Sequence, residues 1–133
     1  MKGYTDCEQS KKLAEFLSLE SADHHYVRKV TDFMGNPVDG KWSVPKYGNP
    51  NSEHANYIVQ NFTNYEKLPC WSLVALLDVL PFPQLSKDKL GSGKVGWMVS
   101  VYPNDCRYDS CWHDNPVDAC YEMIIRLSEL KML

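Results

Sequence analysis

The chain has 133 residues, of which 44% are hydrophobic and 12% aromatic. This length and composition favour one folded domain over residues 1–133 and argue against wholesale disorder. The formal net charge of -3 argues against a general phosphate-binding surface, so nucleic acid is not the expected partner. The first residues lack the apolar run of a signal peptide, and no stretch approaches the roughly 18 apolar residues of a membrane span. We therefore expect a cytoplasmic protein with no membrane contact, and a small homo-oligomer is compatible with these numbers.

The N-terminal part of the chain predicts a helix and then two strands. Residues 5–8, Thr-Asp-Cys-Glu, have the capping-box pattern, with Thr5 as the N-cap and Glu8 as the third helical residue. Amphipathic spacing carries this helix to about Leu19. Two short strands separated by glycine-containing turns are expected next, over residues 25–30 and 41–44.

The middle of the chain predicts a second helix after a polar, aromatic stretch. Residues 47–52 have the composition of a loop, and the apolar spacing within residues 53–66 allows a helix. Residues 69–80 form a firmer helix, because leucines recur there at helical spacing. Further apolar residues widen that stripe, so little of this helix should meet water: Trp71, Val74 and Val79.

The next segment predicts a loop, a strand and a hairpin. Prolines at positions 81 and 83 should end the preceding helix, and residues 84–94 are expected to form a loop. Residues 95–102 alternate as a strand does, with Trp97, Val99 and Val101 on one face. Residues 106–112 follow a Pro-Asn-Asp turn and can return as the hairpin partner of that strand.

The last segment predicts a helix that ends the domain. Asp114 or Asn115 can cap it, and Pro116 suits the first helical position. Glu122 and Arg126 stand four residues apart in the favourable order for an ion pair. One apolar stripe should be buried, formed by Cys120, Met123, Ile124, Leu127 and Leu130.

The order of these elements predicts the fold class. Helices segregate from hairpin-forming strands, which is typical of an α+β domain. We therefore expect a small antiparallel sheet layered with about three helices, in a single domain with a helix at its C-terminal end.

The C-terminal half of the chain resembles a known group of proteins. A Trp-containing apolar helix precedes a Trp-centred strand, Gly-Trp-Met-Val at residues 96–99, and a short polar hairpin leads to the final helix, Asn-Pro-Val-Asp-Ala-Cys at residues 115–120. The early segment Lys-Leu-Ala-Glu-Phe-Leu at residues 12–17 is also similar to the first helix of that group. These features resemble the small α/β proteins of phages and prophages called phage ABA-sandwich proteins. The resemblance implies a mobile-element setting and an intracellular accessory role, and it implies no catalytic residue.

Five cysteines stand in the chain, and no export signal accompanies them, so a disulfide framework is not expected. We expect reduced and mostly buried thiols. The densest set of potential metal ligands has the spacing Cys-x4-Cys-x-His-x6-Cys, which is not a zinc-finger or zinc-ribbon pattern. We therefore predict no metal site and no cofactor at Cys106, Cys111, His113 and Cys120.

Two histidine-containing segments invite a chemical interpretation. Cys111 and His113, with Asp109 or Asp114 as the orienting carboxylate, would supply the nucleophile and base of a small hydrolase. Close neighbours in sequence rarely assemble in this way, so the catalytic hypothesis is an alternative. The second segment, Asp-His-His-Tyr at residues 23–26, could donate imidazoles to a metal. Adjacent strand residues point to opposite faces, however, so surface histidines at a turn are expected.

The aromatic and polar stretch around residues 47–65 is the candidate binding region, although a plain surface loop with one packed aromatic face is the simpler interpretation. Its aromatic side chains suit stacking and protein contact: Tyr47, Tyr57, Phe62 and Tyr65. A nucleic-acid binder would instead need a basic face built from Arg28, Lys29, Lys41 and Lys46. Nucleotide-binding and common hydrolase motifs are lacking. The favoured hypothesis is a non-enzymatic protein binder, and the alternatives are a Cys/His hydrolase or zinc protein and a nucleic-acid binder.

Overall fold

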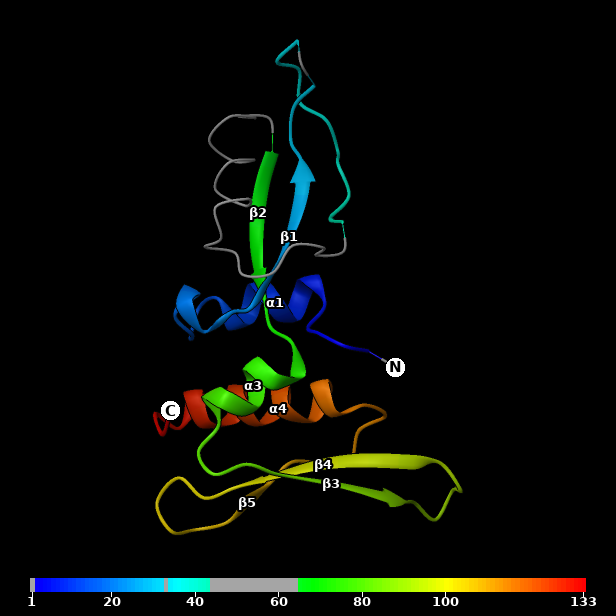
Figure 1. Cartoon of the computed structure of the whole chain (residues 1–133), viewed down its shortest axis with the longest axis vertical. Coiled ribbons are helices and arrows are strands. Elements are labelled where there is room, and N and C mark those ends of the chain that lie inside the picture. The colour runs from blue at the N-terminus through cyan, green and yellow to red at the C-terminus, as the bar shows by residue number, and fades with distance from the viewer. Residues whose placement is uncertain (1, 33, 44–64) are drawn as a thin grey trace. The chain divides into compact units, whose positions relative to one another are not determined.

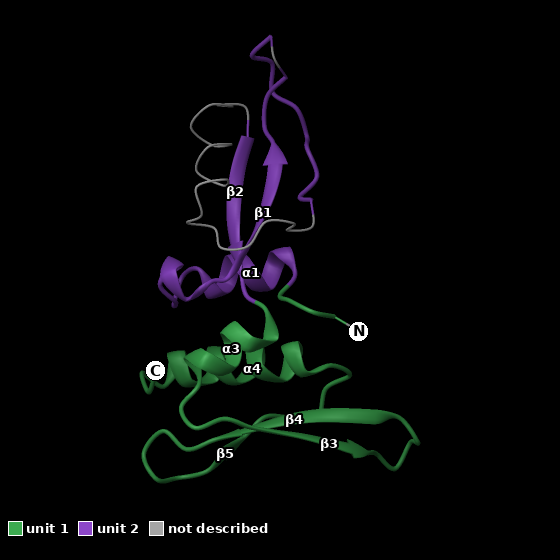
Figure 2. Cartoon of the chain, in the orientation of Figure 1, with its two compact units in different colours: residues 1–5, 72–133 green, residues 6–71 purple. Residues whose placement is uncertain are grey.

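The computed structural model describes residues 2–32, 34–43 and 65–133. The chain groups into two compact units, and Figure 2 colours them separately. Residues 1–5 and 72–133 form unit 1, and residues 6–71 form unit 2. The described parts contain three α-helices and two small antiparallel sheets, with a helix near the C-terminus, so the predicted α+β class is confirmed. The single domain over residues 1–133 stays a prediction, and the units are described one at a time.

Unit 2 begins with helix α1, Cys7–Leu13. The N-cap is Asp6 rather than the predicted Thr5: its carboxylate accepts from the Gln9 N–H at 2.8 Å, and its own N–H donates to the Gln9 side chain at 3.1 Å. The predicted extension to Leu19 is wrong, because Leu13 is the last buried side chain of the segment and Phe16 is exposed. The chain then makes a short 3-10 turn, η1, Leu19–Ser21.

A two-stranded sheet follows in the described part of unit 2 (Figure 1). Strand β1, His24–Lys29, pairs antiparallel with β2, Tyr65–Cys70. The strand predicted over residues 25–30 is therefore confirmed within one residue. Of the second predicted strand, Ser43 makes one isolated bridge to Val27, and residue 44 lies outside the described residues.

Strand β2 contains residues from the ends of two segments that the sequence predicted to be helical. The helix allowed over residues 53–66 is wrong at its last two residues, which begin β2, and the rest of it lies outside the described residues. The helix predicted from residue 69 starts later, because Pro69 and Cys70 complete the strand. Trp71 follows the strand as a fully buried side chain, and its indole N–H donates to the Ser21 hydroxyl at 3.0 Å.

Unit 1 contains helix α3, Leu73–Val79, which Ser72 caps through a bond from the Ala75 N–H. Leu76 is fully buried, whereas Val74 is 75% exposed. The prediction that little of this helix meets water is therefore wrong. A helix of two turns covers its neighbour with one face, so apolar residues on the other face stay outside.

A three-stranded antiparallel sheet lies beside the helices of unit 1 (Figure 1). Its order is β3, Gln84–Lys89; β4, Val95–Val101; and β5, Tyr108–Asp109. The β4 strand is confirmed, and of the hairpin partner predicted over residues 106–112, Tyr108–Asp109 form the paired strand. The loop predicted over residues 84–94 is wrong, because its first six residues pair with β4 along their whole length. A polar segment can form such a strand at a sheet edge, where water solvates its charged side chains.

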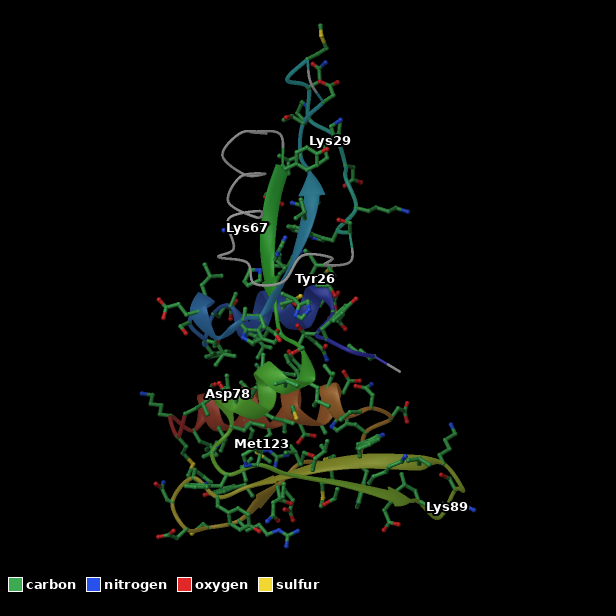
Figure 3. The ribbon with its side chains drawn as sticks, viewed as in Figure 1. Tyr26, Lys29, Lys67, Asp78, Lys89 and Met123 are labelled. Carbon is green, nitrogen blue, oxygen red and sulfur yellow. The ribbon has the colours of Figure 1, made fainter. Side chains whose placement is uncertain are left out.

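Helix α4, Pro116–Glu129, is the central layer of unit 1 and packs against both α3 and β4 (Figure 1). Asn115 is the cap, and its side-chain oxygen accepts from the Asp118 N–H at 2.9 Å. The predicted stripe is confirmed up to Leu127, and Met123, labelled in Figure 3, is fully buried. The prediction that Leu130 belongs to the buried stripe is wrong, because Leu130 is the C-cap residue and is 53% exposed. Among the described residues, no helix has both the length and the hydropathy needed to cross a membrane.

Candidate functional site

The candidate site is built on a register change where β5 continues toward α4. Ser100 of β4 faces Asp109, whereas Trp97 of β4 faces His113 in an isolated bridge. Three steps along β4 therefore match four steps along the returning strand, which is the signature of a β-bulge. Ser110 and Cys111 are the two residues that share one position of β4. There the Val99 N–H donates to the Ser110 hydroxyl at 3.0 Å instead of to a backbone carbonyl.

The bulge decides which face of the sheet each neighbouring side chain occupies. His113 lies opposite Trp97, on the face that carries the fully buried Val99 and packs against α4. Trp112 is the adjacent residue, so its side chain lies on the opposite face, beside Met98. We call this opposite side the outer face, and it includes Gln84, Ser86, Asp88, Met98, Ser100, Asp109 and Trp112.

The outer face carries the exposed tryptophan of the segment. Trp112 is 40% exposed, and Met98 beside it is partly exposed. Among the described residues of unit 1, both helices lie on the other side of the sheet (Figure 1). By this alternation, an aromatic and a thioether side chain both reach solvent on this face.

Glu122 of α4 fixes the backbone that presents Trp112. Its carboxylate accepts from the Cys111 N–H at 3.2 Å to each oxygen and from the His113 ring at 3.0 Å. The bulge takes the Cys111 N–H out of the sheet ladder, and the carboxylate supplies the missing acceptor. Arg126, one turn further along α4, donates to the same carboxylate at 2.8 Å and to the Asp109 carbonyl at 2.7 Å. Two side chains of one helix thus hold both ends of the bulged segment.

The environment keeps the Glu122 carboxylate charged. Burial alone raises the pKa of Glu122. The bonds from His113 and the Cys111 N–H, together with the charge of Arg126, outweigh burial and hold the pKa below its ordinary value of 4.5. Glu122 therefore acts as an ionised acceptor at neutral pH.

A polar cluster borders the outer face on the side of the β4–β5 turn. The Asp109 carboxylate accepts from the Ser100 hydroxyl at 2.7 Å and from the Arg107 guanidinium at 2.8 Å. The hydrogen bond from Ser100 and the contact with Arg107 hold the pKa of Asp109 below its ordinary value. The exposed apolar pair thus has a charged and internally paired rim.

The structure brings Cys111 and His113 to a different carboxylate from the two that the sequence suggested. Glu122, not Asp109 or Asp114, orients the His113 ring. The exposed Cys111 contributes its backbone N–H to this network, and no hydrogen bond joins its thiol to His113 in these described segments. The arrangement contains a base and an orienting carboxylate, but the nucleophile is not hydrogen-bonded to the base.

The cysteines differ in burial. The prediction that they are mostly buried is wrong, since Cys106 and Cys111 are exposed and Cys7 is partly exposed. Burial raises the pKa of the Cys70 thiol to about 12, and that of Cys120 likewise to about 12. Within residues 2–32, 34–43 and 65–133, no three His, Cys, Asp or Glu side chains converge as metal ligands.

Most of the predicted aromatic binding region lies outside the described residues, namely Tyr47, Tyr57 and Phe62. Tyr65 is described, and it begins β2 as a partly exposed residue. Neither histidine of the 23–26 segment lies at a surface turn, because His24 begins β1 and His25 is 2% exposed.

Of the basic residues considered for nucleic-acid binding, Arg28 makes its contacts with other residues of unit 2. It pairs with Glu66 across the sheet, and its guanidinium lies 4.6 Å from the centre of the Trp42 ring. Lys29 and Lys41 are described, and Lys46 lies outside the described residues. An arginine held by a carboxylate and an aromatic ring is already engaged inside the protein, which weakens the case for a basic nucleic-acid face.

Sequence reasoning missed Glu122 and Trp112 as members of one site. The sequence assigned Glu122 to an ion pair with Arg126, which the structure confirms. A carboxylate on a helix face that also borders the buried stripe is the signal that could have drawn attention to Glu122. The position of Trp112 depends on the bulge, which has no local marker in this sequence beyond Ser110.

Searches of protein-family models, curated proteins and solved structures each gave no match to this chain. The assignment of a function therefore depends on the geometry of the chain itself.

Proposed function

We propose that this chain is a non-enzymatic accessory protein of the cytoplasm, of phage or prophage type, that binds another protein through the outer face of the β3–β4–β5 sheet. The observation that carries the proposal is the exposure of Trp112, 40%, in the segment that α4 holds; strand alternation from the Trp97–His113 bridge places it opposite Met98. Tryptophan is enriched among the residues that dominate binding energy in protein interfaces. The resemblance of the C-terminal half to phage proteins supports the intracellular accessory role.

Rigidity makes this tryptophan a favourable anchor. Glu122 and Arg126 hold the backbone before Trp112, at Cys111 and at Asp109, and Glu122 also bonds the ring of His113 after it. Binding to a preorganised side chain costs less conformational entropy than binding to a loop that must first become ordered. The anchoring network therefore increases the affinity that Trp112 can contribute.

The chemistry of the outer face indicates the kind of partner surface. Trp112 and Met98 form an apolar centre, and Met adapts its shape to different partners. Asp109 and Arg107 pair with each other at the rim, so the rim carries no unpaired charge from this cluster. We infer a protein surface with an apolar patch in its centre and neutral polar groups around it.

The test compares Trp112→Ala with Val95→Ala. Val95 is exposed to a similar degree, 46%, but its alternation along β4 places it on the α4 side of the sheet. Proteins captured on the immobilised wild-type chain from the native host are purified, and their binding is measured by calorimetry. Truncating an anchor tryptophan costs about 2 kcal/mol, or about a 30-fold rise in Kd. Val95→Ala should leave Kd within about threefold.

Two outcomes would overturn the proposal. Equal binding by both variants would show that the outer face is not the contact surface. Weakening by Val95→Ala alone would place the contact on the other face of the sheet. Circular dichroism melting curves verify that each variant is folded before its affinity is interpreted.

A second candidate function is thiol chemistry at Cys111, and one observation favours it. Glu122 orients His113, whose ring lies two residues from the exposed Cys111 on the same strand. The test is the rate of alkylation by iodoacetamide, with the exposed Cys106 as the internal reference. A Cys111 rate well above that of Cys106, and reduced by His113→Ala, supports this function. Equal rates at the two cysteines exclude it.

A further inference from the structure

We propose that the edge of β3 away from β4, with which no other strand of the described residues pairs, accepts an extended, acidic segment of the partner protein as a fourth strand of the sheet. This inference rests on the proposed function, because it extends the outer face and names the kind of segment that the partner supplies. The sheet order β3–β4–β5 places β3 at an edge, over Gln84–Lys89. Edge strands with unpaired backbone groups are the sites at which extended peptides add to sheets.

The hydrogen bonds of β4 show which groups of β3 face outward. Trp97 uses its N–H and carbonyl with His113, on the β5 side, so neither group bonds to β3. Its antiparallel partner Lys87 therefore also points its backbone groups away from β4. The same argument applies to Leu85, whose partner Val99 bonds to Ser110. The outward stretch ends at residue 89, whose N–H donates to the Asp88 side chain at 2.8 Å.

Charge along this edge disfavours two of the three registers in which a second copy of the chain could pair with β3. A two-fold pair of β3 strands can bond only outward residues with outward residues, so Lys87 would face residue 85, 87 or 89 of the other copy. The last two of these registers place lysine directly opposite lysine, because residues 87 and 89 are both Lys (Lys89 is labelled in Figure 3). Like charges directly opposite each other destabilise a strand pair. Acidic side chains at the same positions gain attraction instead.

The lysines of β3 favour acidic residues in the incoming strand, and the outer face favours apolar residues between them. Ser86 is small, partly exposed and directly opposite Met98, so it leaves room beside the Met98 side chain. An apolar residue of the incoming strand, next to Ser86, can reach across it and extend the apolar row of Met98 and Trp112. Strand alternation then places the acidic residues of the same segment beside Lys87 and Lys89. The segment is therefore one in which acidic and apolar residues alternate.

The test uses a blocked octapeptide of alternating Glu and Val, with an alternating Lys and Val peptide as the charge-reversed control. Binding to the full chain is followed by NMR titration and by amide hydrogen exchange. We expect the acidic peptide to protect the Leu85 and Lys87 amides, which point outward, and to bind about tenfold more tightly than its control. Equal binding of the two peptides, or no new protection at these amides, would overturn the inference.

Substitutions at one position separate the backbone contribution from the charge. Lys87→Pro removes an outward N–H and leaves the β3–β4 ladder intact, since proline is tolerated at sheet edges. Lys87→Ala removes the charge and keeps the N–H. We expect Lys87→Pro to abolish protection at the Leu85 amide and Lys87→Ala to weaken binding severalfold with protection retained. Protection that survives in Lys87→Pro contradicts strand addition.

Other outcomes have defined meanings. Association of the chain with itself, measured by sedimentation and lost in Lys87→Pro, would assign the edge to a second copy and overturn the acidic segment. Failure of the peptide test with a full Trp112→Ala effect on the captured partner rejects the β3 inference alone. Peptide addition at β3, with partner binding unaffected by Trp112→Ala, rejects the proposed outer-face anchor alone.

Discussion

Replacing Glu122 by alanine tests whether α4 holds the segment that presents Trp112. The substitution removes the acceptor of the Cys111 N–H at 3.2 Å and of the His113 ring at 3.0 Å, and it removes the Arg126 contact at 2.8 Å. Hydrogen bonds to a charged group contribute about 1.5–3 kcal/mol when buried. The Glu122 side chain is 25% exposed, water can replace part of the lost bonding, and Ala favours the helix by a few tenths of a kcal/mol. We therefore expect a net local loss of about 2 kcal/mol.

Amide hydrogen exchange over residues 109–113 measures this loss directly. A local loss of about 2 kcal/mol speeds exchange of the Cys111 amide about 30-fold. Glu122→Gln keeps one side-chain oxygen and should give an intermediate increase. Glu129→Ala is the matched control, because Glu129 is exposed in the last turn of the same helix. Wild-type exchange rates at Cys111 in Glu122→Ala, or an equal effect from Glu129→Ala, would refute the anchoring argument.

Two further predictions concern the same helix. The pKa of Glu122 is lowered in the folded chain, so its stabilising contribution is complete above its ordinary value of 4.5 and is lost as pH falls through the lower folded value. The urea midpoints of wild type and Glu122→Gln should therefore differ at pH 7 and converge in acid; a constant difference would contradict this linkage. Iodoacetamide should label the exposed Cys111 in the native chain and reach Cys120 only after denaturation, since burial raises the pKa of that thiol to about 12. Mass spectrometry of the labelled peptides checks this, and native labelling of Cys120 would show that α4 is not packed as described.

Helix α4 could be predicted from sequence because its determinants are local. Asn115 and Pro116 mark its first turn, and its buried side chains recur at helical spacing up to Leu127. Its end was misplaced because the apolar Leu130 has helical spacing but is 53% exposed. Local pattern therefore identifies the buried stripe, and tertiary packing decides how far it continues.

Strand β3 could not be predicted because its determinant is the adjacent strand. Its residues Lys87, Asp88 and Lys89 are depleted in strands, and the hydrogen bonds that order them come from β4. The candidate site could not be predicted from the sequence for a similar reason. Alternation counted along a regular strand places Trp112 and His113 correctly only if the extra residue at the bulge is known.

The bulge at Ser110 makes this surface sensitive to chain length in a way that substitutions do not reveal. Without the extra residue, the regular register would bring Trp112 opposite Trp97 and turn it toward α4, while His113 would lose its place beside Glu122. Deleting one residue here would exchange the inward and outward sides of the segment, although every remaining amino acid is unchanged. Among related chains, alignment gaps at this position should therefore be rarer than amino-acid replacements at Trp112 itself.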